Sequence, residues 1–200
     1  MATTTQPPAY NTIAWIPPSA AKTYLNHPIT HVRALCLPPG PIDPSEPDGK
    51  QTNHWILSLH LPNGISLALD PSPSGPNNTL VCGISVIDST STATATPNNP
   101  TPVKTLPLTP SPNQSASMTV ESFLTTLKTH NLTNYTFSPT GQGCRFWIGS
   151  VADTLAQNAV VDAQEVETLK DALGSTWAGD GSEMEMEGGR GSGVVEGTFF

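Results

Sequence analysis

The chain has 200 residues and a formal net charge of −8 at pH 7, and only 12% of its residues are charged, against roughly 25% in an average soluble domain. Its 8 lysines and arginines are dispersed, which excludes the clustered basic surface that nucleic-acid binding requires. The length allows one domain, and 21 prolines and 16 glycines indicate that many connections are loops.

Composition divides the chain into three parts. Residues 1–28 form an N-terminal segment rich in Pro and Thr, and residues 29–175 form a single α+β domain. That domain contains a low-complexity insertion at about 89–117, which carries no acid and a single lysine. Residues 176–200 are an acidic, Gly-rich tail without an apolar face, and we expect this tail to be disordered.

The sequence indicates neither secretion nor a membrane span. The cysteines Cys36, Cys82 and Cys144 are odd in number and have no zinc-type spacing. The first residues lack the basic start and apolar core of a secretory signal, and no run approaches the ~18 apolar residues of a membrane helix. We therefore expect an intracellular, cytoplasmic protein with reduced thiols, no stable membrane insertion, and no metal or organic cofactor. The sequence indicates no protein partner and leaves the oligomeric state open.

The first half of the chain predicts β-strands. Short β-branched or alternating segments, each ended by a turn, predict strands at residues 29–37, 54–61, 65–70 and 79–88. In the second of these, alternation places His54, Ile56, Ser58 and His60 on one side and Trp55, Leu57, Leu59 and Leu61 on the other. A later segment at residues 103–109 contains Pro107 and predicts an edge strand.

The second half predicts three helices. Residues 119–131 carry apolar residues at positions i, i+3, i+4 and i+7 behind Thr119 as N-cap. Residues 144–158 carry an apolar stripe that begins at Cys144, and residues 162–174 begin with capping-box spacing and end at a glycine. Strands followed by helices predict an α+β fold, in which a small antiparallel sheet of four to five strands packs against two to three helices.

Cys144, in the segment QGCRFWI, is the candidate nucleophile. A cysteine at a helix N-terminus lies over unpaired backbone N–H groups, which favour the reactive thiolate. The competing interpretation is a buried thiol, because free cysteine is among the most frequently buried residue types and Cys144 belongs to an apolar stripe. The neighbouring Arg145 either lowers the thiol pKa or binds an anion, or is a solvated residue of the first helical turn.

His54, which begins the strand segment HWILSLHL, is the candidate base. A helix packed on the sheet would bring its imidazole within the roughly 2.6–3.2 Å that proton transfer requires. The alternative is a strand-start histidine that bonds only to backbone. His60 faces the same side but lies about 20 Å away along the strand, too far to act as a relay. His27, His31 and His130 show no metal-binding spacing.

Two segments carry a resemblance to known enzymes. NHWILSLHLPNGISLALDPS begins with a His-Trp pair and a hairpin, and YTFSPTGQGCRFWIGSV has a tyrosine followed by Cys-x-x-Trp and an apolar helix. These segments, about forty residues in all, resemble circularly permuted papain-like enzymes of the lecithin:retinol acyltransferase and NlpC/P60-like branches. The resemblance implies a permuted papain-like fold with Cys144 as nucleophile and His54 as base. This chain has Gly143 where those enzymes carry asparagine.

Over its whole length the chain resembles a fungal domain family of unknown function more closely. That family carries the same His-Trp and Gly-Cys-Arg-Phe-Trp signatures, which here begin at His54 and Gly143. This second resemblance implies a shared domain and brings no activity with it.

Asp70 is the candidate for orienting His54, and the preceding turn decides where its carboxylate points. If residues 62–64 form a three-residue loop, Ile56 opposes Asp70, and the carboxylate lies on the His54 face, about 7–8 Å away on the diagonal. If the loop has only two residues, Leu57 opposes Asp70, and the carboxylate points away from His54.

Two functional hypotheses follow. In the first, the protein is a thiol-dependent hydrolase or acyltransferase that acts on an amide, isopeptide or acyl substrate. Cys144 attacks the carbonyl, His54 acts as base and then as acid, and Asp70 orients the imidazole. A peptide, isopeptide or small amide suits the sequence better than a lipid, because no membrane-seeking segment is visible. In the second, the domain is a non-catalytic binding or scaffolding module that retains Cys144 and His54 as core residues.

Overall fold

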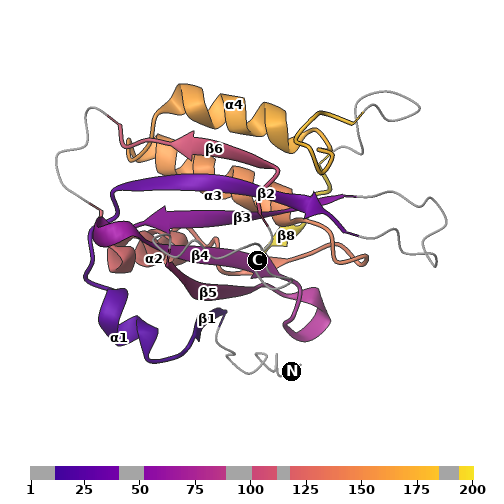
Figure 1. The fold of residues 1–200 in the computed structure, drawn as a ribbon. Helices are drawn as coiled ribbons and strands as arrows, with labels where there is room; N and C mark the ends of the chain where they lie inside the picture. The colour runs from indigo at the N-terminus through magenta and orange to yellow at the C-terminus, as the bar shows by residue number, and fades with distance from the viewer. Residues whose placement is uncertain (1–11, 41–51, 89–100, 112–117, 185–193) are drawn as a thin grey trace, which may run out of the picture.

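The computed structural model describes residues 12–40, 52–88, 101–111, 118–184 and 194–200. In these ranges the chain forms a six-stranded sheet in the order β1-β5-β4-β3-β2-β6 and a two-stranded sheet of β7 and β8 (Figure 1). The strands are β1 (Ile13–Ile16), β2 (His31–Pro39), β3 (Asn53–His60), β4 (Ile65–Ser72), β5 (Val81–Asp88), β6 (Lys104–Leu108), β7 (Tyr135–Thr136) and β8 (Thr198–Phe199). The α-helices are α1 (Ala20–Tyr24), α2 (Val120–Thr129), α3 (Cys144–Gln157) and α4 (Ala163–Leu173).

The sheet is larger than the four to five strands expected, and it is mixed rather than wholly antiparallel. β1 pairs in parallel with β5 at one edge. The other four pairs of neighbouring strands, from β5–β4 to β2–β6, are antiparallel. The described ranges also hold four helices instead of two to three. β1 and α1 were not predicted, because elements of four and five residues give no periodic signal in the sequence. Burial of Ile13, which is 6% exposed, shows that β1 joins the core.

The strand that carries His54 has the predicted inner face, but Ile56 and Ser58 on its other side are also buried, at 8% and 2% exposed. Its inner face carries Trp55, Leu57 and Leu59, all fully buried. This face packs against α3, which lies behind the sheet together with α2 in Figure 1. β6 forms the other edge of the sheet and contains Pro107, which an edge strand tolerates because one side of its backbone needs no ladder partner.

The turn between β3 and β4 has three residues. His60 pairs with Ser66 and Leu57 pairs with Leu69, and residues 62–64 form a short 3₁₀ turn between the strands. One further step along the same register places Ile56 opposite Asp70. The first of the two registers considered above is therefore the one adopted, and it puts the Asp70 carboxylate on the face that carries His54.

The three long helices begin where the sequence predicts. Thr119 caps α2 by accepting a hydrogen bond from the Ser122 backbone N–H at 3.1 Å, and Asp162 caps α4. α3 begins at Cys144 itself and has no side-chain cap. The N–H groups of its first turn therefore stay available near the thiol.

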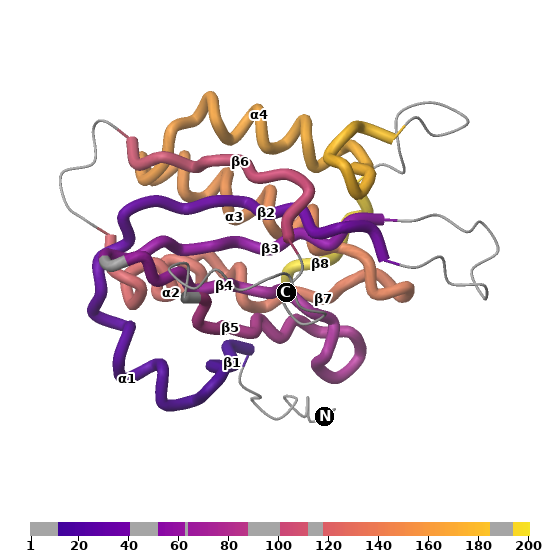
Figure 2. The backbone as a smooth tube through the Cα atoms, in the orientation of Figure 1, coloured from indigo at the N-terminus to yellow at the C-terminus, as the bar shows by residue number. Residues whose placement is uncertain are grey.

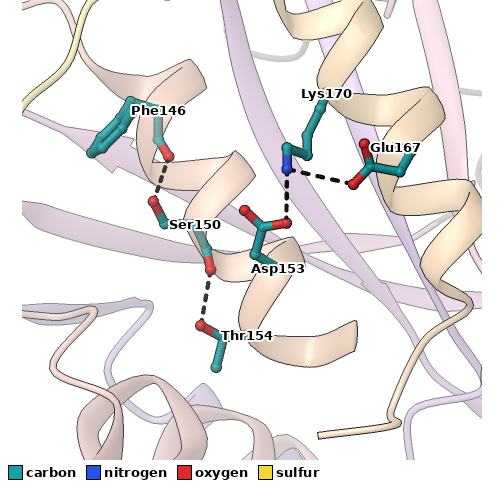
Figure 3. Close-up of polar contacts among 6 residues, drawn as sticks. All are labelled: Phe146, Ser150, Asp153, Thr154, Glu167 and Lys170. Carbon is teal, nitrogen blue, oxygen red and sulfur yellow. Dashed lines mark hydrogen bonds and ion pairs between the residues drawn. The ribbon is translucent and has the colours of Figure 1, made fainter. Parts of the chain in front are cut away.

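α4 packs against α3 and supports the helix that begins at Cys144. Figure 3 shows the Lys170 side chain of α4 between the carboxylates of Asp153 in α3 and Glu167 in α4. Lys170 Nζ lies 3.2 Å from Asp153 Oδ1 and 3.5 Å from Glu167 Oε1. It also shows the hydroxyls of Ser150 and Thr154 bonded to carbonyls four residues earlier in α3. The charged side chains are at least 40% exposed, so each pair contributes about 0–1 kcal/mol. Most of the stabilisation comes from the buried apolar faces of the two helices: Ile148, Val151, Ala152, Leu155, Val166, Leu169 and Leu173.

Parts of the predicted tail contact the domain. Trp177 is 8% exposed, and β8 pairs with β7 beside the start of α3, as the tube in Figure 2 shows. In residues 176–184 and 194–200 of this tail, Trp177 and Phe199 make tertiary contacts, whereas the Phe200 side chain is 61% exposed. Residues 89–100 and 112–117 of the predicted insertion, and 185–193 of the tail, lie outside the described residues.

Candidate active site

The three predicted site residues lie together. His54 is the second residue of β3, Asp70 lies in β4, and Cys144 is the first residue of α3. His54 Nε2 is 2.6 Å from Asp70 Oδ1, and the His54 side chain hydrogen-bonds the Cys144 side chain. Because Nε2 faces Asp70, Nδ1 is the imidazole nitrogen left for the sulfur. The contact series is thiol, imidazole and carboxylate, and the catalytic roles of these residues stay predictions.

Asn53 positions the start of β3. It is 1% exposed, and its side chain donates to the carbonyls of Leu37 and Trp177, each at 2.9 Å. Its Oδ1 accepts the Trp177 backbone N–H at 2.7 Å. These bonds tie β3 to the irregular end of β2, where the pairing register shifts between Cys36 and Pro39, and so place the neighbouring His54. Sequence patterns did not single out Asn53, because its partner Trp177 is 124 residues away.

Tyr135 and Gly143 position the start of α3. Gly143 has φ of 143°, and a Cβ there would lie 2.5 Å from the Tyr135 hydroxyl. The same hydroxyl donates a hydrogen bond to the Gly143 carbonyl at 3.0 Å in the buried interior. Only glycine fits both the backbone conformation and the close approach. This explains why the chain lacks the asparagine that the papain-like pattern has before its nucleophile.

Gly143→Ala is expected to destabilise the protein by about 2–4 kcal/mol, because the new methyl group meets the Tyr135 hydroxyl in a backbone conformation that L-residues rarely adopt. Urea unfolding, followed by tryptophan fluorescence, measures the change. Gly149→Ala, within α3, is the matched control. Its Cβ would lie 3.6 Å from Leu173 Cδ1, an ordinary contact, and alanine should stabilise the helix by about 1 kcal/mol. Equal effects of the two substitutions would contradict the role assigned to Gly143.

The surroundings of Cys144 lower the pKa of its thiol. Burial on its own raises that pKa, but the hydrogen bond and positive charge of His54 outweigh it, with help from the Trp55 backbone N–H and the charge of Arg145. Cys144 is half-buried as a residue and lines an open groove, which gives a small reagent a route to it. A thiolate is therefore favoured at the one cysteine that lies at a helix N-terminus.

The pKa of His54 shifts in the opposite direction. Burial on its own lowers it, but the hydrogen bond to Asp70, together with the hydrogen bond and charge of Cys144, raises the pKa of His54 to about 10. The His54 and Asp70 side chains are 38% and 53% exposed, so water screens part of this interaction. The two shifts act in the same sense, and they favour an imidazolium beside a thiolate over a neutral imidazole beside a thiol.

Arg145 is buried, not solvated. It is 6% exposed, and one guanidinium nitrogen donates to the carbonyls of Leu173 and Ser175 at 3.2 and 3.4 Å. These carbonyls lie at the C-terminal end of α4, where the helix dipole favours a positive charge. That contact compensates for the unfavourable position of a cation in the first turn of α3.

Cys144 and His54 line a groove of about 330 Å³. Its walls come from the end of β2, the start of β3, the loop before α3, and one residue near β8: Leu37, Pro38, Gly40, Thr52, Asn53, His54, Gly141, Gln142, Gly143, Cys144, Arg145 and Val195. Sequence reasoning missed Val195, because it falls in the part of the chain expected to be disordered. His54 and Arg145 are the only charged or titratable side chains besides the thiol among these described wall residues.

The remaining cysteines and histidines do not line this groove. Cys36 and Cys82 are fully buried, and burial raises the pKa of Cys36 to about 12. His60 stacks on His31 at 4.1 Å between ring centroids, and burial with the nearby positive charges lowers its pKa to about 4. In the described ranges, no group of three or more His, Cys, Asp or Glu side chains is arranged to hold a metal ion.

None of the helices in the described part of the chain has the length and apolar character needed to cross a membrane.

Comparison with known proteins identifies the family of this chain. A family model described as a domain of unknown function (DUF7770) matches residues 40–200, so the chain belongs to that family. The matched range contains His54, Asp70 and Cys144. No curated protein and no solved structure matches the chain.

Proposed function

We propose that this DUF7770 domain is a thiol-dependent hydrolase or acyltransferase that acts on an amide, isopeptide or acyl substrate. The observation that carries the proposal is the hydrogen-bonded series Cys144, His54 and Asp70 on the wall of a groove, with the thiol at the N-terminus of α3. The order of the groups along the chain and in space supports a permuted papain-like arrangement, which we propose as the ancestry of the site.

The first half of the proposed reaction forms a thioester. The Cys144 thiolate attacks the carbonyl carbon of the substrate, and the carbonyl π electrons move to oxygen, giving a tetrahedral oxyanion. The uncapped N–H groups in the first turn of α3 are suited to stabilise that charge. The carbon–nitrogen or carbon–oxygen bond then breaks, and the His54 imidazolium gives its proton to the leaving amine or alcohol.

The second half releases the acyl group. Neutral His54 takes a proton from water, or from an acceptor amine or alcohol, as that group attacks the thioester carbonyl. The carbon–sulfur bond breaks, the product leaves, and the thiolate–imidazolium pair is restored. Asp70 holds the imidazole in one orientation and stabilises its charged form throughout.

The lowered pKa of the thiol leads to a pH-dependent prediction. Alkylation of Cys144 by iodoacetamide should reach half of its maximal rate well below pH 8.5, the ordinary range of a free thiol, because only the thiolate reacts. In His54→Ala the hydrogen bond and positive charge are lost, so the midpoint should move upward by at least one pH unit. Rates are measured across pH by mass spectrometry of the peptide that contains Cys144.

His130→Ala is the control for this experiment, because His130 is exposed and bonds only Asn158 and backbone groups of α2. Its alkylation midpoint should equal that of the parent chain. An inert Cys144, or a midpoint indifferent to His54, would contradict the proposed enzyme and favour the alternative of a non-catalytic binding or scaffolding module.

A further inference from the structure

Residues 194–200, named the strap here, are fastened to the loop that precedes α3. β8 pairs with β7, the Phe200 N–H donates to the Asn134 carbonyl at 3.1 Å, and Asn131 Nδ2 donates to the Phe200 carbonyl at 2.6 Å. Phe199 packs on Tyr135 with ring centroids 4.8 Å apart. Backbone pairing and aromatic packing together hold the strap in one place.

The strap also contacts the group that positions the nucleophile. The Gly197 N–H donates to the Tyr135 hydroxyl, which in turn donates to the Gly143 carbonyl at 3.0 Å. A Cβ at Gly197 would collide with the tyrosine ring, so glycine permits this close approach. One side chain thus connects the strap to the residue before Cys144.

Two adjacent valines of the strap face different hollows. Val195 lines the groove that contains Cys144 and His54. Val194 lines a separate hollow of about 260 Å³ on the α3–α4 side, which includes Phe146 and the Lys170 shown in Figure 3. Successive residues of an extended segment point to opposite sides, which explains why Val194 and Val195 line different hollows.

The groove offers apolar contacts, and the two charged side chains in its wall are either paired or buried in the protein. Leu37, Pro38 and Val195 give it apolar walls. Of its charged groups, His54 is engaged by Asp70. Arg145 is 6% exposed: its Nη1 donates to carbonyls at the α4 terminus, and its Nη2 is buried without a hydrogen-bond partner, so the guanidinium is not presented to the groove. A substrate group carrying its own charge would therefore lose hydration in this groove without gaining an ion pair.

We propose that Val195 is a specificity-determining residue, and that the groove selects an uncharged, apolar group of limited bulk next to the reacting carbonyl. This inference rests on the proposed function, because it names the substrate class for the same thiol. The strap forms one wall of the groove, and the size of the side chain at position 195 sets the width.

The test compares two reagents at Cys144, iodoacetamide and N-benzyl iodoacetamide, which share a reacting group and differ in bulk. The ratio of their rates within one variant cancels any change in the thiolate fraction. The ratio is the rate with N-benzyl iodoacetamide divided by the rate with iodoacetamide. Val195→Trp should lower this ratio about tenfold, and Val195→Ala should raise it about threefold. Val194→Trp is the matched control, since it enlarges the neighbouring residue on the other side, and it should leave the ratio unchanged.

The charge preference is tested in the unaltered chain, which keeps the inference falsifiable if a tryptophan variant does not fold. N-benzyl iodoacetamide should alkylate Cys144 at least about fivefold faster than N-carboxymethyl iodoacetamide, relative to their rates with free cysteine. The inference would be overturned if the benzyl and carboxymethyl reagents had equal relative rates. It would also be overturned if substitutions at positions 194 and 195 changed the ratio of the benzyl reagent to iodoacetamide equally. An ordinary pH midpoint of alkylation would instead overturn the proposed function, so the two failures are distinguishable.

Discussion

Cys144→Ser is expected to slow acyl transfer from p-nitrophenyl acetate by roughly 10⁴- to 10⁶-fold, the range found when a covalent nucleophile is removed. The electrostatics that lower the thiol pKa leave a serine hydroxyl protonated, because its pKa lies far higher. The measurement is the initial release of nitrophenolate, combined with the mass of the acylated protein. The parent chain should gain one acetyl group at Cys144, and the variant none.

Cys82→Ala is the control for this substitution. Cys82 is fully buried in β5, and burial raises the pKa of its thiol, so it should take no part in the reaction. Its loss should leave the acetylation rate per folded molecule unchanged. Retention of nitrophenolate release in Cys144→Ser would show that another group attacks the ester and would contradict the proposed nucleophile.

Asn53→Ala is expected to lower the free energy of unfolding by about 3–4 kcal/mol, because it removes the Asn53 hydrogen bonds to both buried Trp177 backbone groups and to the half-buried Leu37 carbonyl. Urea unfolding measures the loss. The variant should also react with iodoacetamide at a higher pH midpoint, since the start of β3 no longer holds His54 against the thiol.

Thr52→Ala is a matched control from the same wall of the groove. Thr52 precedes Asn53 and is partly exposed, so its truncation should change the free energy of unfolding by no more than about 0.5 kcal/mol. If Thr52→Ala and Asn53→Ala have the same small effect, the bonds to Trp177 do not hold β3 in place.

The site combines groups that come from distant parts of the chain. The proposed nucleophile, Cys144, lies at a helix terminus, the proposed base, His54, lies in a strand, and Asp70 lies in the next strand. A strand buried on its inner face and a helix packed in the core restrict how far His54 and Cys144 can move. Such rigid support is what keeps an activated thiol and its base in hydrogen-bonding geometry.

The sequence by itself determined the features that depend on neighbours along the chain. Period-two alternation identified the inner face of β3, and the capping residues Thr119 and Asp162 located two helix starts. Cys144 was recognised as the first residue of a helix because the apolar stripe begins there. These patterns arise from local backbone geometry, in which residues two, three or four positions apart share a face.

Only the tertiary structure decided the features that depend on distant partners. Both possible turns before Asp70 were compatible with the sequence, and the pairing of β3 with β4 selected the one that places Asp70 beside His54. The burial of Arg145 depends on carbonyls near Leu173, and the groove wall at Val195 depends on β8 joining β7. Such long-range contacts leave no periodic pattern in the sequence, because their energies arise only once segments that are far apart in the chain pack together.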